Sequence, residues 1–116
     1  MIYTGRDMFT IKQYNTIPSL EATLVDYLGQ PVPLSGATVN FAMRSRDNPN
    51  LVISGVAVVV DAAAGKVSYQ WNAADTYVSG SYIAEFIVTH PNGGKESFPN
   101  GDYIQVHVVR SAANTL

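Results

Sequence analysis

The stretch Gly80–His90, GSYIAEFIVTH, alternates between two sets of side chains. Successive side chains of an extended strand point to opposite faces, so one face would carry Tyr82, Ala84, Phe86 and Val88. The opposite face would carry Ile83, Glu85 and Ile87. Residues 91–95, PNGGK, contain Asn92-Gly93, the dipeptide that most strongly indicates a tight hairpin. This stretch therefore predicts a β-strand with one buried face, followed by a turn.

The same alternation recurs along the chain and predicts an all-β fold. It indicates strands over Met8–Gln13, Ser19–Asp26, Thr38–Arg44, Lys66–Trp71 and Tyr103–Val109. The segment Leu51–Asp61 is apolar on both faces around Gly55, which predicts a buried strand or a pair of short strands bent at the glycine. About seven strands with turns between them are typical of an immunoglobulin-like antiparallel β-sandwich.

One local motif bears on the topology. Asp75, Gly80 and Tyr82, in DTYVSGSY, resemble the tyrosine corner of immunoglobulin-like domains, in which a tyrosine hydroxyl bonds back to an upstream backbone group. The alternative is that Tyr82 is only a core aromatic residue. Either interpretation leaves the sandwich intact.

The length of 116 residues fits one compact domain. We expect the sandwich to span residues 8–110, with residues 1–7 as an N-terminal extension and residues 111–116 as a C-terminal tail. The first residues, MIYTGRD, lack the basic and apolar regions of a secretory signal, and no apolar run approaches the roughly 20 residues of a membrane span. We therefore expect the protein to fold in a cytoplasm.

Charge and cysteine content exclude several classes of function. The net charge is −2 and only 14% of the residues are charged, without a basic run, which disfavours nucleic acid and anionic membranes as partners. The chain has no cysteine, so disulfides, thiolate catalysis and cysteine-ligated zinc are excluded. The fold must be held together by packing and hydrogen bonds.

The sequence offers little that supports an enzyme. The candidate bases are His90 and His107, on different predicted strands, and together with Glu85 they could bind a metal, but no ligand spacing suggests a site. We interpret both histidines as solvated surface residues, and Trp71 and Tyr69 as core aromatics. We predict no catalytic residue, no cofactor and no metal.

The outer face of the best-defined strand is more informative. If the strand at 80–90 pairs with that at 103–109 through the Asn92-Gly93 hairpin, then Ile83, Ile87 and Val109 form an exposed apolar patch, with Tyr103 beside it. Such patches often mark protein contacts, although scattered surface aliphatics are also ordinary. We predict Ile83, Ile87, Tyr103 and Val109 as protein-contact residues.

Several fragments carry a resemblance to a known family, in the same order and spacing. They are FTIKQ from Phe9, PSLEATL from Pro18, PLSGATVNFAMR from Pro33, VDAAAGKVSYQW from Val60, GSYIAEF from Gly80 and FPN from Phe98. Over residues 8–109 the chain resembles the N-terminal domain of phage upper baseplate proteins. The resemblance implies an immunoglobulin-like sandwich in a tailed-phage virion, with no catalytic residues.

The expected function is that of a structural protein, an assembly or attachment module of the baseplate, tail or neck. Its partners would be other virion proteins, in a homo-oligomer or symmetric assembly that forms in the host bacterial cytoplasm. We expect Met1–Gln13, or the last strand with its tail, to make such contacts through a sheet edge. The alternatives are capsid-surface decoration, a host-adhesion module in which Tyr77 or Tyr103 stacks on sugars, and, last, a small enzyme.

Overall fold

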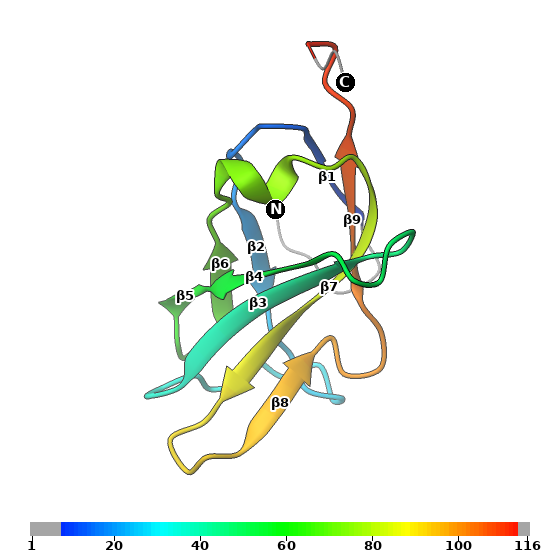
Figure 1. Ribbon diagram of the computed structural model, residues 1–116. Helices are drawn as coiled ribbons and strands as arrows, with labels where there is room; N and C mark the ends of the chain where they lie inside the picture. Colours follow the sequence, from blue (N-terminus) through cyan, green and yellow to red (C-terminus); the bar gives the residue numbers. More distant parts are fainter. Residues whose placement is uncertain (1–7, 114–116) are drawn as a thin grey trace.

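The computed structural model describes residues 8–113 and contains two β-sheets packed face to face (Figure 1). The strands are β1 (Met8–Lys12), β2 (Leu20–Thr23), β3 (Thr38–Ser45), β4 (Val52–Val56), β5 (Val58–Asp61), β6 (Lys66–Tyr69), β7 (Gly80–Thr89), β8 (Lys95–Phe98) and β9 (Ile104–Val109), with a short 3-10 helix η1 (Ala73–Thr76). The predicted all-β sandwich is confirmed. The predicted extension at residues 1–7, and residues 114–116 of the predicted tail, lie outside the described residues.

The order of the strands matches an immunoglobulin domain. The larger sheet has the order β1-β9-β7-β3-β4, and the smaller sheet has the order β2-β6-β5. Thus β3, β7 and β9 take the places of the C, F and G strands of an immunoglobulin domain, while β2, β6 and β5 take those of B, E and D. The predicted immunoglobulin-like architecture therefore holds at the level of topology.

Two pairings differ from the predicted antiparallel arrangement of about seven strands. Strand β1 pairs with β9 in parallel, from Met8 opposite Gln105 to Lys12 opposite Val109. The Asn92-Gly93 turn joins β7 to β8, a strand that the sequence did not predict, and not to β9. The reason is that KESF of β8 does not alternate, and it becomes a strand only because the turn folds it back onto the second half of β7. Strand β9 pairs with the first half of β7 instead.

The apolar segment from Leu51 to Asp61 forms two edge strands, one in each sheet. The chain crosses between the sheets at Ala57, whose N–H still bonds the Val39 carbonyl of β3 at 2.9 Å. The predicted bend at Gly55 is therefore wrong. Gly55 lies inside β4, where a Cβ would come within 2.9 Å of the Tyr69 ring, so this position needs a glycine for close approach.

The prediction that this segment is buried holds for one face only, since Ala57 is buried and Ile53 and Val59 pack against the core. Val52, Val56, Val58 and Val60 are 46%, 78%, 59% and 61% exposed. They are exposed because β4 and β5 are the last strands of their sheets and turn these side chains to the outer faces. The two strands follow one another at the same side of the sandwich, at the left of Figure 1.

Aromatic side chains fill the space between the sheets. The ring of Phe41 stacks on Tyr69 with centroids 4.3 Å apart, and meets Trp71 and Phe86 edge-on at 5.5 and 5.4 Å. Tyr69 and Trp71 are buried, which confirms them as core aromatics. The predicted inner face of β7 is buried as well, at Tyr82, Ala84, Phe86 and Val88.

The tyrosine corner is present. The hydroxyl of Tyr82 donates to the Val78 carbonyl at 2.5 Å, four residues upstream, while the ring is buried in the core. Asp75, the other end of the motif, accepts hydrogen bonds from the Tyr69 hydroxyl at 2.6 Å and from the Asn72 N–H at 2.9 Å. Burial, together with the hydrogen bond to Asp75, raises the pKa of Tyr69. These bonds tie the η1 segment to both sheets.

Candidate protein-contact surface

The outer face of the larger sheet, on the side away from the smaller sheet, holds the predicted contact strand. On β7 the side chains of Ile83, Glu85 and Ile87 are half-buried and alternate with the core residues. Arg44 of β3 lies opposite Ile83, and Ala42 lies opposite Glu85. Arg44 and Glu85 are therefore diagonal neighbours across β3 and β7, a spacing of about 7–8 Å between Cα atoms. The part of this face around Ile83 therefore combines aliphatic side chains with the cation Arg44 and the anion Glu85.

A shallow hollow lies on this face. Its volume is about 230 Å³, and it is lined by Ala42, Met43, Arg44, Val52, Ile83, Glu85 and Tyr103. Arg44 is anchored at one side, because its guanidinium donates to the Pro49 carbonyl of the loop between β3 and β4. The hollow could accept a small apolar side chain flanked by polar or charged groups. It holds no pair of groups arranged for catalysis.

The structure brings together two of the four predicted contact residues. Ile83 and Tyr103 both line the hollow. Ile87 lies four residues after Ile83 along β7, opposite Asn40 of β3 and Ser97 of β8. Val109 is at the other end of β9, opposite Lys12 of β1.

The predicted patch of Ile83, Ile87 and Val109 is therefore not contiguous. Ile83 pairs with Gln105, so Ile87 and Val109 are separated by eight register positions, about 27 Å at the rise of an antiparallel strand. The prediction assumed that the hairpin turn joins β7 directly to β9, whereas β8 occupies that place. A contact role for these four residues stays a prediction.

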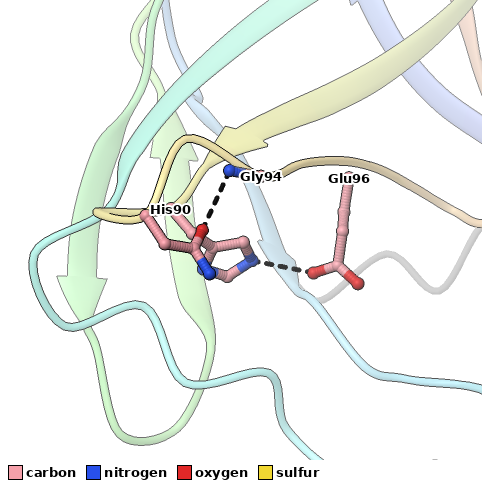
Figure 2. Close-up of polar contacts among 4 residues, drawn as sticks. His90, Gly94 and Glu96 are labelled. Carbon is pink, nitrogen blue, oxygen red and sulfur yellow. Dashed lines mark hydrogen bonds and ion pairs between the residues drawn. The ribbon is translucent and has the colours of Figure 1, made fainter.

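The histidines make local polar contacts. At the β7–β8 hairpin, His90 Nε2 is 2.8 Å from Glu96 Oε2, and the N–H of Gly94 donates to Asn92 Oδ1 at 2.9 Å (Figure 2). On β9, His107 Nδ1 is 3.4 Å from the Ser81 hydroxyl. His90 therefore contacts Glu96, while Glu85, which was considered from the sequence with the two histidines as a metal ligand, lies at the hollow. Residues 8–113 contain no group of three or more His, Asp or Glu side chains that could hold a metal.

The exposed tyrosines do not form a common platform. Tyr103 precedes β9 and lies at the hollow, whereas the carbonyl of Tyr77 accepts a hydrogen bond from Gln13, at the opposite end of β9. Tyr77 meets Tyr14 edge-on with centroids 5.5 Å apart. Tyr14 and Tyr77 therefore form one exposed aromatic pair, which does not include Tyr103.

A second cleft opens between the sheets at the end of β2. It measures about 200 Å³ and is lined by β2 and the following loop, by Phe98, Pro99 and Asn100, and by Ile104. Asp26 is the only charged residue in this lining. Its carboxylate accepts from the N–H groups of Leu28 and Gln30, so it stabilises its own loop. This cleft does not have convergent ionisable groups.

The edge formed by β4 and β5 is a surface that the sequence did not predict. Its exposed valines were expected in the core because the segment is apolar on both faces. The absence of charge from residues 51–60 is the signal that could have marked it, since edge strands usually carry charge.

No helix within residues 8–113 is long and apolar enough to cross a membrane.

Comparisons with known proteins agree with this architecture. The model of the BppU N-terminal domain family matches residues 9–100. Among solved structures, the N-terminal domain of phage TP901-1 ORF48 is similar, with a TM-score of 0.65 and 18% sequence identity over 89% of this chain and 85% of that chain. At this identity the likeness shows the fold alone. No curated protein matches the chain. Because the family model covers most of the sequence, the chain belongs to the BppU N-terminal domain family of phage baseplate proteins.

Proposed function

We propose that this protein is a structural module of a phage baseplate, which joins neighbouring virion proteins by protein–protein contacts and has no catalytic activity. The observation that carries the proposal is the family match over residues 9–100. The similarity to the phage TP901-1 domain supports the same fold class. As a component of the baseplate, the protein would reside in the virion.

The outer face of the larger sheet is the contact surface that the geometry supports best. The hollow around Ile83 and Tyr103 offers aliphatic and aromatic side chains for a buried centre, and Arg44 and Glu85 supply opposite charges beside it. Protein interfaces commonly combine such an apolar centre with a polar surround. The occupant we propose is a neighbouring virion protein that inserts an apolar side chain into this hollow.

The test is the incorporation of variants into phage particles. Ile83→Glu places a second carboxylate beside Glu85 in the hollow, and we expect at least a tenfold loss of incorporation, the usual size of a hot-spot effect. Incorporation is measured by quantitative mass spectrometry of purified particles. Thermal unfolding of the purified variant establishes that it still folds.

The matched control is Thr38→Glu, an exposed residue on the outer face of β3 that does not line the hollow. We expect this variant to be incorporated like the unaltered protein. Equal incorporation of a folded Ile83→Glu variant would contradict the proposed contact surface. Absence of the unaltered protein from particles would contradict the virion role itself.

A further inference from the structure

Strand β4, at one edge of the larger sheet, has no charged residue, proline or bulge, unlike the strands at the opposite side of the sandwich. Edge strands of natural proteins usually carry a charge, a proline or a bulge that prevents pairing with another chain. Residues 52–60, which we call the valine edge, contain neither a charged residue nor a proline. On the opposite side, β1 carries Lys12 and β2 carries Glu21.

Of the two strands in the valine edge, β4 has the regular ladder. Its pairing with β3 runs without a register shift from Val52 to Val56, whereas β5 has a bulge between Val59 and Asp61. A bulge disturbs the free edge of a strand, so β5 is less suited to accept another chain. Strand β4 is therefore the natural place for strand addition.

The free backbone groups of β4 can be assigned from its pairing with β3. Ala57 donates to Val39, and the carbonyl of Leu51 accepts from Ser45, so the odd-numbered residues of this segment direct their N–H and C=O groups toward β3. In an antiparallel ladder the residues between them direct these groups away. Val52, Ser54 and Val56 therefore present their N–H and C=O groups to whatever lies beside the sheet.

These three residues form a palindrome about Ser54. If a second β4 strand lies antiparallel to the first with Ser54 opposite Ser54, then each Val52 lies opposite a Val56 of the other copy. Every outward N–H of the strand then meets an outward carbonyl. Side chains directly opposite each other on antiparallel strands are in contact, so Val52 and Val56 bury apolar area against one another and the two Ser54 hydroxyls are neighbours. No like charges meet, because the segment has none.

We propose that β4 pairs with β4 of a second copy of this chain, about a two-fold axis at Ser54, to join two larger sheets into one. In this arrangement the exposed side chains of Val52 and Val56 of one copy pack across the strands against those of the other copy. This goes beyond the proposed function, because it concerns a different surface and a contact between identical chains.

The first experiment measures the mass of the protein in solution by light scattering or sedimentation. We expect a monomer–dimer equilibrium that shifts toward the dimer as concentration rises. Val56→Lys places a charge on the edge opposite Val52 of the other copy, and we expect it to weaken the dimer at least tenfold. The control is Leu28→Lys, an exposed apolar residue in the loop after β2, which should leave the dimer unchanged.

The second experiment is amide hydrogen exchange, which tests the register residue by residue. In the dimer we expect slow exchange of the amide hydrogens of all five residues of β4, that is, Val52, Ser54 and Val56 as well as Ile53 and Gly55. In Val56→Lys we expect alternation, with rapid exchange at Val52 and Ser54 and continued protection at Ile53 and Gly55, whose N–H groups face β3.

The third experiment uses the absence of cysteine from the chain. Hydrogen-bonded antiparallel pairs have Cα atoms about 5.5 Å apart, within the range that a disulfide can bridge. We expect Ser54→Cys to form an interchain disulfide readily under mild oxidation. Thr38→Cys, on the interior strand β3, is equally accessible and should not form one at a comparable rate.

The outcomes separate this inference from the proposed function. A protein that stays monomeric at all concentrations, or a dimer that survives Val56→Lys and does not crosslink at Ser54→Cys, overturns the pairing of β4. A dimer that these variants break or trap supports the pairing, whatever Ile83→Glu does to incorporation into particles.

Discussion

Two groups of valines in this protein have opposite environments. Val39, Val67, Val88, Val106 and Val108 are at most 1% exposed, whereas four of the five valines of β4 and β5, namely Val52, Val56, Val58 and Val60, are 46% to 78% exposed. Both groups stand in strands, where β-branched residues are favoured. Residue type is therefore the same in both groups, and what differs is the position of the strand in the sheet order and the face to which the side chain points.

The difference in burial means that the two groups of valines contribute to different processes, the interior valines to folding and the exposed valines to assembly. Burial of a valine side chain stabilises a fold by about 1.5–3 kcal/mol, a gain that the interior valines realise within one chain. The four exposed valines of the valine edge do not realise this gain in the single chain. Their apolar area can contribute to free energy only when another surface covers it.

The largest expected effect is in the aromatic interior that the buried valines surround. Trp71→Ala removes a side chain that contacts Phe9, Phe41 and Tyr69, and should reduce the free energy of unfolding by about 3–5 kcal/mol. Chemical denaturation of the purified variant measures this change. A loss below about 1 kcal/mol would contradict the assigned core.

A matched pair of substitutions tests the comparison directly. Val88→Ala deletes two buried methyl groups and should cost about 2–3 kcal/mol, because it adds a cavity to the lost transfer energy. Val56→Ala should change the stability of the monomer by no more than about 0.5 kcal/mol. Denaturation at low protein concentration measures both. Equal losses at the two positions would break the distinction between interior and edge.

Tyr69→Phe examines a polar contact at the boundary of the interior. It removes the hydrogen bond to the Asp75 carboxylate and should cost about 1.5 kcal/mol, because Asp75 keeps its bond from Asn72. Burial raises the pKa of Tyr69, so the folded protein keeps this hydroxyl protonated at a pH where the unfolded tyrosine ionises. The contribution of the Tyr69 hydroxyl to the free energy of unfolding is therefore complete below a pH of about 10 and decreases as the pH rises above that value.

The pH dependence supplies the control for this variant. Unfolding free energies measured from neutral to alkaline pH should fall less steeply for Tyr69→Phe than for the unaltered protein. The remaining decrease includes Tyr82, because burial raises its pKa as well. An unchanged alkaline slope in Tyr69→Phe would show that this hydroxyl is not protected as the structure indicates.

The smallest expected effect of a substitution in the core concerns the tyrosine corner. Tyr82→Phe keeps the buried ring and removes only the bond to the Val78 carbonyl, for an expected cost of about 1 kcal/mol. The melting temperature measures it, with Tyr103→Phe at an exposed position as the control. If Tyr82→Phe lowers the melting temperature no more than Tyr103→Phe does, then the hydrogen bond of Tyr82 does not stabilise the fold and Tyr82 acts only as a core aromatic residue.

The elements that the sequence predicted well are those with local signals. The strand at 80–90, the inner face from Tyr82 to Val88 and the turn at Asn92-Gly93 follow from period-two alternation and from turn residues. The tyrosine corner also has a short motif, which is why Tyr82 could be singled out.

The contact surface was predicted less well, because it depends on which strands are neighbours. The sequence placed Ile83 and Tyr103 on one face, but it did not show that β8 lies between the hairpin turn and β9. Consequently Ile87 and Val109 were expected to be close and are not. The parallel pairing of β1 with β9 also covers an edge of the last strand, which therefore cannot accept another chain along β9 as we had expected.

The sequence alone determined the all-β class, most of the strands and the inward faces, because these depend on side-chain periodicity and turn chemistry over a few residues. Only the tertiary structure decided that the most apolar segment, Leu51–Asp61, lies at an edge. Its pattern is equally compatible with a central strand, since apolar residues on both faces suit either burial by other strands or burial by a partner. The long-range pairing of β4 with β3 and of β5 with β6 places the segment at an edge, where four of its valines are exposed.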